Sequence, residues 1–166
     1  MRFDRPIALC DANVLYPASV RDLLIRLART GIIGARWTAR IHDEWIRNLL
    51  ANRPDLAAAQ LQRTRELMDA AVPGAMVEDF EHRIPGLTLP DPDDRHVLAA
   101  AIEAEADVIV TFNTRDFPAP VVAQYGIGAT GQSGQAAPEC GGVFQRSDAG
   151  GLPRTADALR ASGVDL

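Results

Sequence analysis

The sequence predicts an α/β protein in which helices cover both faces of a parallel sheet. Two short apolar runs, at residues 7–10 and 107–112, lack the alternation of polar and apolar residues that marks a half-exposed strand. Continuously apolar strands are typical of parallel sheets that are buried on both faces. Several amphipathic helical segments separate the two runs, as in a sheet built from crossover connections. A length of 166 residues fits one domain.

Three helices are expected in the first part of the segment between the two strands. The first begins near Ser19, which forms a capping-box pattern with Asp22, and it stops before Gly31. Thr38 has the side chain to cap a second helix that continues to about residue 51. The third runs from about Pro54 to residue 71, because proline suits the first turn of a helix.

A fourth helix precedes the second strand. Asp91 is the expected cap of this helix, with Pro92 at its first position. The strand at residues 107–112 is rich in β-branched residues and ends before Asn113. Residues 76–77 and 87–89 are either short strands or loop.

The composition changes after residue 125. Residues 126–154 hold eight of the thirteen glycines, with little periodicity, and a weak helical pattern follows at residues 155–161. We therefore expect one domain over residues 1–128 and a Gly-rich tail over 129–166 that is poorly ordered or atypical. The tail is either a natural low-complexity segment or coding sequence read in a shifted frame.

Several classes of protein are disfavoured by composition. No apolar stretch approaches the 18–20 or so residues of a membrane-spanning helix, and the acidic N-terminal segment does not resemble a signal peptide. Cys10 and Cys140 lie far apart without the spacing of metal ligands. A cytoplasmic protein without membrane contact is expected.

The net charge of −5 hides an uneven distribution. Residues 21–65 contain nine Arg and four acids, whereas residues 66–116 contain twelve acids and three Arg. A basic first half beside an acidic second half is compatible with a phosphate-binding rim next to a metal-binding centre.

Four acids are candidates for one site: Asp11 after the first strand, Glu44 in the second helix, Asp94 at the start of the fourth helix, and Asp116 after the last strand. In parallel sheets the ligand lies at the carboxyl ends of the strands, where Asp11 and Asn113 fall. Clustered carboxylates repel one another unless a cation neutralises them, and Mg²⁺ and Mn²⁺ prefer oxygen ligands. The cluster indicates metal-assisted phosphodiester hydrolysis.

Each acid also has a purely structural interpretation. The alternatives are a strand-end turn at Asp11, an ion pair of Glu44 with Arg40 or Arg47, a helix cap at Asp91, a solvent-facing Asp93, and an ion pair of Asp116 with Arg115. The three histidines do not have ligand spacing. His96 points about 200° around its helix from Asp94, which argues against a general base there.

The order of these motifs resembles the PIN domain family. The matching segments are LCDANVL from Leu9, DEW from Asp43, DPDDRHVLAAA from Asp91 and ADVIVTFNTRDF from Ala106. The match looks like the branch that contains VapC-type toxins, and it covers roughly residues 5–128.

This resemblance implies a Rossmann-like three-layer α/β/α sandwich with a central parallel sheet, and a Mg²⁺- or Mn²⁺-dependent endoribonuclease. The acids of the family fall on Asp11, Glu44 and Asp94, with Asp91 and Asp93 as possible substitutes for the third. The fourth ligand position falls on Asn113, with Asp116 close behind. Asn13 would hydrogen-bond to Asp11 and orient it without itself binding the metal, and Thr111 would have the same supporting role.

The resemblance also implies partners. RNA would be the substrate, with Arg40, Arg47 and Arg115 against its backbone. The protein would be the toxin of a type II toxin–antitoxin pair, a homodimer neutralised by a small antitoxin protein. A non-catalytic PIN-like module that binds RNA or a protein is the alternative, and a phosphatase or small DNA nuclease using the same carboxylates is a third reading.

Overall fold

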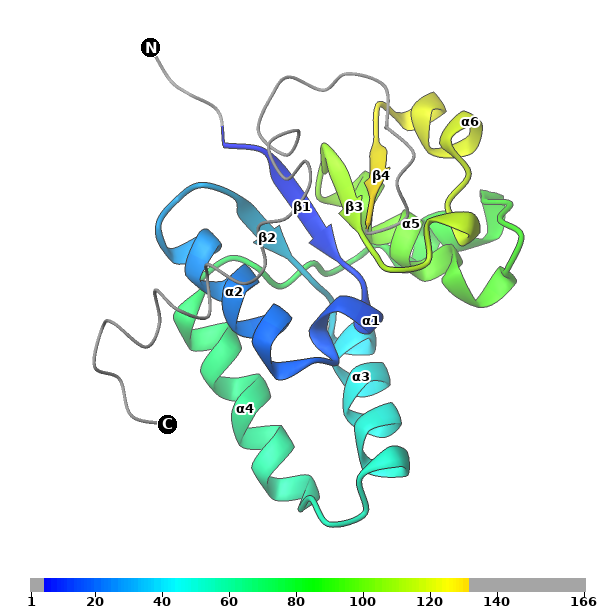
Figure 1. Ribbon diagram of the computed structural model, residues 1–166. Coiled ribbons are helices and arrows are strands. Elements are labelled where there is room, and N and C mark those ends of the chain that lie inside the picture. The colour runs from blue at the N-terminus through cyan, green and yellow to red at the C-terminus, as the bar shows by residue number, and fades with distance from the viewer. Residues whose placement is uncertain (1–4, 132–166) are drawn as a thin grey trace, which may run out of the picture.

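A computed structural model describes residues 5–131 of the chain. Its centre is a sheet of four parallel strands, β1 (Ile7–Cys10), β2 (Gly34–Arg36), β3 (Val108–Val110) and β4 (Gly128–Thr130). The strands lie in the order β2-β1-β3-β4 (Figure 1). This all-parallel sheet flanked by helices confirms the predicted three-layer α/β fold.

The connections between the strands place a site at one end of the sheet. The chain passes from β1 to β2 through α1 (Ala12–Leu15) and α2 (Ala18–Arg29), and from β2 to β3 through α3 (Ala39–Asn52), α4 (Ala58–Ala71) and α5 (Arg95–Glu103). Because β2 and β3 lie on opposite sides of β1 and such crossovers are right-handed, α2 and α5 cover opposite faces. The winding direction therefore reverses between β1 and β3, and ligands bind at such a reversal, beyond the carboxyl ends of the strands.

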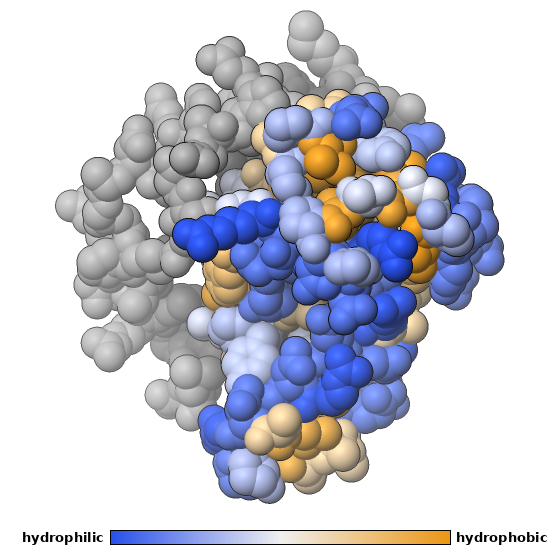
Figure 2. Space-filling view, turned by 90° about the vertical axis from the view of Figure 1, so that its right-hand side faces the viewer, coloured by the Kyte–Doolittle hydropathy of each residue, from blue (hydrophilic) through white to orange (hydrophobic). Residues whose placement is uncertain are grey.

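Short elements complete the described chain: the 3₁₀ turns η1 (Glu81–Gly86), η2 (Pro92–Asp94), η3 (Thr114–Asp116) and η4 (Ala123–Tyr125), and the helix α6 (Ala119–Val122). Within residues 5–131, none of the helices combines the length and apolar character that crossing a membrane requires. Figure 2 shows a largely hydrophilic face, with hydrophobic residues gathered in its upper part and at the lower tip, where α3 and α4 meet.

The core lies between the sheet and its two helical layers. Leu9 of β1, Ile109 of β3 and Leu98 of α5 are fully buried. Residues 99–101 of α5 are three consecutive buried alanines, whose small side chains allow the helix to approach β1 and β3 closely. Burying this apolar surface is the main favourable term in the stability of the fold.

A polar network holds α3 and α4 together. The indole N–H of Trp37 and the Nε2–H of His42 both donate hydrogen bonds to the Oδ1 atom of Asp69, at 2.8 and 3.1 Å. The indole N–H of Trp45 donates to Nδ1 of His42 at 3.0 Å, so His42 is neutral with its proton on Nε2. Burial also lowers the pKa of His42, which favours the neutral ring. One carboxylate of α4 thus satisfies the polar atoms of three buried rings, directly or through His42.

Local signals located several boundaries correctly. The first strand occupies Ile7–Cys10 as predicted, and the second is confirmed as a strand, although it is shorter than residues 107–112. The hydroxyl of Thr38 accepts the N–H of Ile41 at 3.1 Å and caps α3. Asp91 likewise accepts the N–H of Asp93 at 2.9 Å, and Pro92 follows at the first position as predicted, but the element that Asp91 caps is the 3₁₀ turn η2, which leads into α5.

The predicted capping box of α2 is wrong. The helix begins at Ala18, one residue before Ser19, and its N-cap Pro17 has no side-chain hydrogen bond. The carbonyl of Pro17 accepts the N–H of Arg21 at 3.0 Å, so the first turn already includes Ser19.

The predicted start of α4 is also wrong. The helix begins at Ala58, and Pro54 lies in the turn that precedes it. Arg53 and Asp55 form an ion pair across this turn at 2.7 Å, and the N–H of Leu56 donates to the carbonyl of Arg53 at 3.1 Å. These local bonds form a turn where the proline pattern predicted helix.

The Gly-rich segment contains an unexpected strand. β4 lies where we expected tail, and Ala129 is in register with Ile109 of β3. The predicted division after residue 128 therefore falls inside β4. Residues 132–166 and the helical pattern at 155–161 lie outside the described residues. Of the undecided segments, Met76 forms a single parallel bridge with Trp37, and residues 87–89 form no strand.

Removing the carboxylate that joins the three rings will destabilise the fold. We expect Asp69→Ala to lower the free energy of unfolding by about 1–3 kcal/mol, because buried N–H groups of Trp37 and His42 lose their acceptor. Urea denaturation at pH 7 measures the change. Glu66→Ala on the same helix is the control, since its surface ion pair with Arg63 is worth less than about 1 kcal/mol. Equal stability of the two variants would contradict the role of the network.

Candidate functional site

Asp11 stands at the carboxyl end of β1 and caps α1. Its Oδ1 atom accepts the N–H of Ala12 at 2.7 Å, and its Oδ2 atom accepts the hydroxyl of Thr111 at 2.8 Å. The residue is only 6% exposed, and this burial raises the pKa of its carboxyl group, while the two hydrogen bonds oppose the rise. A carboxylate is therefore held at the strand end with both oxygens oriented.

Asn13 ties the ends of β1 and β3 together. Its Nδ2 atom donates to the hydroxyl oxygen of Thr111 at 2.9 Å, and its Oδ1 atom accepts the N–H of Phe112 at 3.0 Å. The resemblance implied that Asn13 orients Asp11 directly. In the structure Asn13 binds Thr111, and Thr111 binds Asp11, so the support passes through the hydroxyl group.

Asp94 faces Asp11 from the start of α5. Desolvation, the charge of Asp11 and a bond to Asp116 raise the pKa of Asp94 to about 7. Asp116 in turn accepts a short hydrogen bond from the side-chain amide of Asn113. Three carboxylates thus crowd together at the ends of β1 and β3, and Asp94 holds a proton near neutral pH because a second full charge there is unfavourable.

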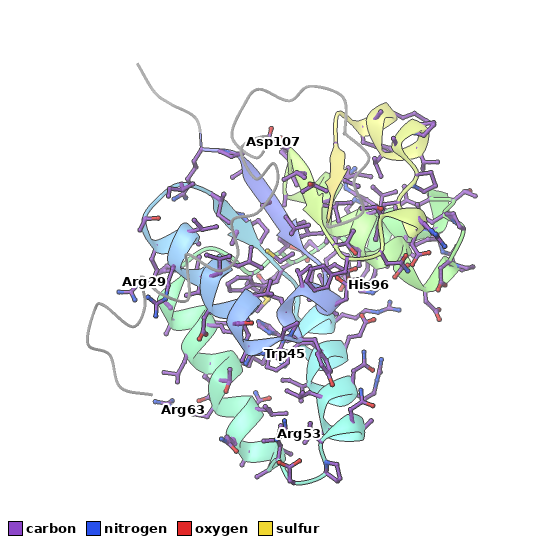
Figure 3. The ribbon with its side chains drawn as sticks, in the orientation of Figure 1. Arg29, Trp45, Arg53, Arg63, His96 and Asp107 are labelled. Atoms are coloured by element: carbon purple, nitrogen blue, oxygen red, sulfur yellow. The ribbon has the colours of Figure 1, made fainter. Side chains whose placement is uncertain are left out.

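Glu44 reaches the same region from α3, and His96 lies beside it. The Nε2 atom of His96 is 3.5 Å from Oε2 of Glu44, and this contact is the largest cause of the lowered pKa of Glu44. His96 is 2% exposed, and its Nδ1 atom has no hydrogen-bond partner among the described residues. Figure 3 labels His96 close to α1 and α3. The prediction for His96 considered only its angle from Asp94 of the same segment. The contact with Glu44 was therefore missed, because Glu44 lies on a different helix.

The acids described above border a cleft of about 420 Å³, whereas Thr111 and His96 lie behind its lining. Its lining residues are Asp11, Ala12, Asn13, Tyr16, Glu44, Asn48, Asn52, Asp91, Asp94, Asn113 and Asp116. All four acids that were expected to converge line this one cleft. Tyr16, Asn48 and Asn52 were not predicted, although Asn48 and Asn52 follow Glu44 at intervals of four residues, which places them on one side of a helix.

The remaining candidates lie outside the cleft lining. Asp93 is exposed, and only its backbone N–H is used, in the cap formed by Asp91. Arg40, Arg47 and Arg115 are exposed as well. Arg47 and Arg40 nevertheless lie close enough to Glu44 for their charges to lower the pKa of its carboxyl group.

The cleft has the donor chemistry that a hard divalent cation requires. Its carboxylate and amide oxygens are the ligands that Mg²⁺ and Mn²⁺ prefer. The repulsion that raises the pKa of Asp94 is what a cation between Asp11, Asp94 and Asp116 would relieve. Within residues 5–131, no group of three or more His, Cys, Asp or Glu side chains is gathered tightly enough to hold a metal. Glu44 is turned to His96, and Asp116 is turned to Asn113.

Together, the fold and the cleft define a class: a three-layer α/β protein with an acidic cleft at the reversal point of its parallel sheet. The family model of the PIN domain matches residues 8–115, more than half of the chain, and the chain belongs to the PIN domain family. PIN domains are generally nucleases, hydrolases that cleave nucleic acids, and PIN nucleases act on RNA. No curated protein and no solved structure matches the chain.

The crowding of the carboxylates predicts a dependence of stability on pH. Folding raises the pKa of Asp94 from 3.8 to about 7, so in this window the folded state binds a proton that the unfolded chain has released. The free energy of unfolding contributed by Asp94 is therefore fully present below about pH 4 and is lost as the pH rises through about 7. In a chelator, wild type should lose stability over this range relative to Asp94→Asn.

Urea denaturation at several pH values measures this difference. Asp93→Asn is the matched control, because the exposed Asp93 lies outside the cleft lining and should leave the pH profile of wild type unchanged. Parallel profiles for wild type and Asp94→Asn would show that burial and the neighbouring carboxylates do not raise the pKa of Asp94.

Proposed function

We propose that this protein is a Mg²⁺- or Mn²⁺-dependent endoribonuclease. One observation carries the proposal: in a chain of the PIN domain family, the cleft at the ends of β1 and β3 collects Asp11, Glu44, Asp94 and Asp116. Phosphodiester hydrolysis needs an activated water and a stabilised leaving oxygen, and a divalent cation in such a cleft supplies both.

The cation ligands in this proposal are the four acids together with Asn113, which adds a neutral oxygen. Asp91 also borders the cleft and is a possible further ligand, whereas Asp93 lies outside the lining. Thr111 and the N–H of Ala12 orient the two oxygens of Asp11, and Asn13 fixes Thr111. The buried His96 contacts the carboxylate of Glu44 and orients it. These contacts fix the ligands before substrate arrives, which lowers the cost of assembling the site.

Arginines on the rim would position the RNA. Arg40 and Arg47 are exposed on α3 close to Glu44, and Arg115 is exposed at the end of β3. Guanidinium groups bind phosphate oxygens in a planar, bidentate manner. Contacts of this kind fix the position of the backbone without reading its sequence. Attack of water on the phosphorus would then leave 5′-phosphate and 3′-hydroxyl ends.

Replacing Asp11 tests the nuclease directly. Asp11→Asn keeps the shape of the side chain and one of its two acceptor oxygens, turns the other position into an amide donor, and removes a charge from the ligand set. With a mixed RNA pool and Mg²⁺ or Mn²⁺, we expect cleavage by wild type, none in chelator, and a rate at least about 100-fold lower for Asp11→Asn. Asp93→Asn, which changes an acid outside the cleft lining, should cleave like wild type. Unaltered cleavage by Asp11→Asn would refute the assignment.

We further propose that the nuclease is the toxin of a type II toxin–antitoxin pair in the cytoplasm. The motif order shared with VapC-type toxins supports this role. The partners would be a small antitoxin protein and a second copy of the chain in a homodimer.

A growth assay tests the toxin role. Induced expression of the full chain in bacteria should arrest growth, and expression of Asp11→Asn should not, because growth arrest requires RNA cleavage. Normal growth with active, expressed wild-type enzyme would contradict toxicity and leave the nuclease assignment intact.

A non-catalytic module that binds RNA or protein is the second candidate. It is favoured by the neutral Asn113 at the fourth ligand position and by the contact of its amide with Asp116. Cation-dependent turnover separates the two candidates, since a binding module does not require it.

A further inference from the structure

One wall of the cleft carries no charge. Five acids border the cleft, but its continuation away from Glu44 is lined by Tyr16, Asn48 and Asn52. The two asparagines lie one and two turns beyond Glu44 on the same side of α3. At about 1.5 Å per residue, Asn52 lies roughly 12 Å along the helix from Glu44. This is about the length of three stacked nucleotides at roughly 3.4 Å each.

The polar groups of this wall are largely unused by the protein. Among residues 5–131, the side chain of Asn48 makes no hydrogen bond. The Nδ2 atom of Asn52 donates to the hydroxyl oxygen of Tyr16 at 3.2 Å, and its Oδ1 atom accepts nothing from the described residues. Asparagine offers a donor and an acceptor side by side, which matches the edge of a nucleobase.

Tyr16 contributes an aromatic ring to this wall. The residue is half-buried at the end of α1, where its N–H donates to the carbonyl of Ala12 at 3.0 Å. The guanidinium group of Arg21 donates to the carbonyls of Leu15 and Tyr16, at 2.7 and 3.3 Å. The backbone that carries the ring is therefore fixed. A fixed, partly exposed aromatic ring is the kind of surface on which unpaired RNA bases stack.

The two sides of Glu44 on α3 differ in charge. On the helical wheel, Arg40 and Arg47 lie to one side of Glu44, and Asn48 and Asn52 lie to the other. Phosphates are attracted to the arginines and repelled by the carboxylates. Uncharged bases are the part of RNA that fits beside the neutral wall.

We propose that Tyr16, Asn48 and Asn52 form a binding site for unpaired nucleobases next to the scissile phosphate. This inference rests on the proposed ribonuclease function and adds a base-binding subsite to its catalytic cleft. The asparagines would select nucleotides on one side of the cut, and the tyrosine would stack with a base.

Binding and cleavage should be measured separately. Binding uses fluorescence anisotropy of a labelled single-stranded RNA of random sequence, in chelator, with the full chain. We expect Asn48→Ala and Asn52→Ala to weaken binding about five-fold each, and Tyr16→Ala by more than about five-fold. Tyr16→Phe, which keeps the ring, should bind within about two-fold of wild type, and a duplex of the same RNA should bind weakly.

Gln62→Ala is the matched control, because it removes an exposed amide of α4 that does not line the cleft. Its binding should equal that of wild type. In the cleavage arm, sequencing of the RNA ends produced with Mg²⁺ should show changed nucleotide frequencies at adjacent positions on one side of the cut for the asparagine variants only.

The outcomes separate this inference from the function on which it rests. Wild-type cleavage with unchanged binding and unchanged nucleotide frequencies in the variants would overturn the base-binding wall and leave the nuclease standing. RNA binding that depends on Asn48 and Asn52 without any cleavage would support the wall and refute the nuclease. Equal binding of duplex and single-stranded RNA would overturn the recognition of unpaired bases by this wall. Absence of both binding and cleavage would overturn both proposals.

Discussion

The hydroxyl group of Thr111 is the point on which the arrangement of the cleft depends. It donates to Asp11 at 2.8 Å and accepts from Asn13 at 2.9 Å, so it joins the carboxyl ends of β1 and β3. A second acceptor bond comes from the N–H of Asn113, at 3.1 Å. Because Thr111 is fully buried, water does not replace these bonds. The reversal of winding between β1 and β3 creates the space, and this hydroxyl fixes the acid at its edge.

Burying and crowding the acids of the cleft destabilises the folded protein, and the stability of the surrounding structure offsets this. Asp11 and Asp94 both have raised pKa values, because each loses solvent and faces another carboxylate. Such strain persists only where the surrounding structure is stable without it. The buried β1, β3 and α5, and the bonded rings between α3 and α4, supply that stability on either side of the cleft. Crowded carboxyl groups with raised pKa values are typical of functional sites, including sites that bind a cation, and are uncommon on an ordinary protein surface.

The sequence predicted those features that local chemistry determines. The strand at Ile7–Cys10, the cap at Thr38 and the cap at Asp91 follow from short-range patterns, and the convergence of acids follows from parallel strands ending at one edge. β4 was missed because Gly128–Thr130 has little strand propensity and forms only by pairing with β3.

Contacts between separate helices were equally invisible in the sequence. The contact between His96 and Glu44 could be predicted only from the packing of α5 beside α3. The cleft wall at Tyr16 could be predicted only from the position of α1, which is too short to produce a periodic pattern in the sequence. The roles assigned to all of the site residues, Asp91, Asp93 and the three rim arginines included, remain predictions.

The fluorescence of the two tryptophans of the chain can report on the region next to the cleft. Both are fully buried; Trp45 donates to His42, and the guanidinium group of Arg21 lies 4.8 Å above its ring. Trp45 is also the residue after Glu44, and Arg21 holds the carbonyl of Tyr16. Tryptophan fluorescence therefore originates behind the cleft, in the packed unit formed by α3, α4 and the residues bonded to them. An emission change on adding RNA or a cation would report movement of that unit, and a constant emission would report a cleft that works as a rigid body.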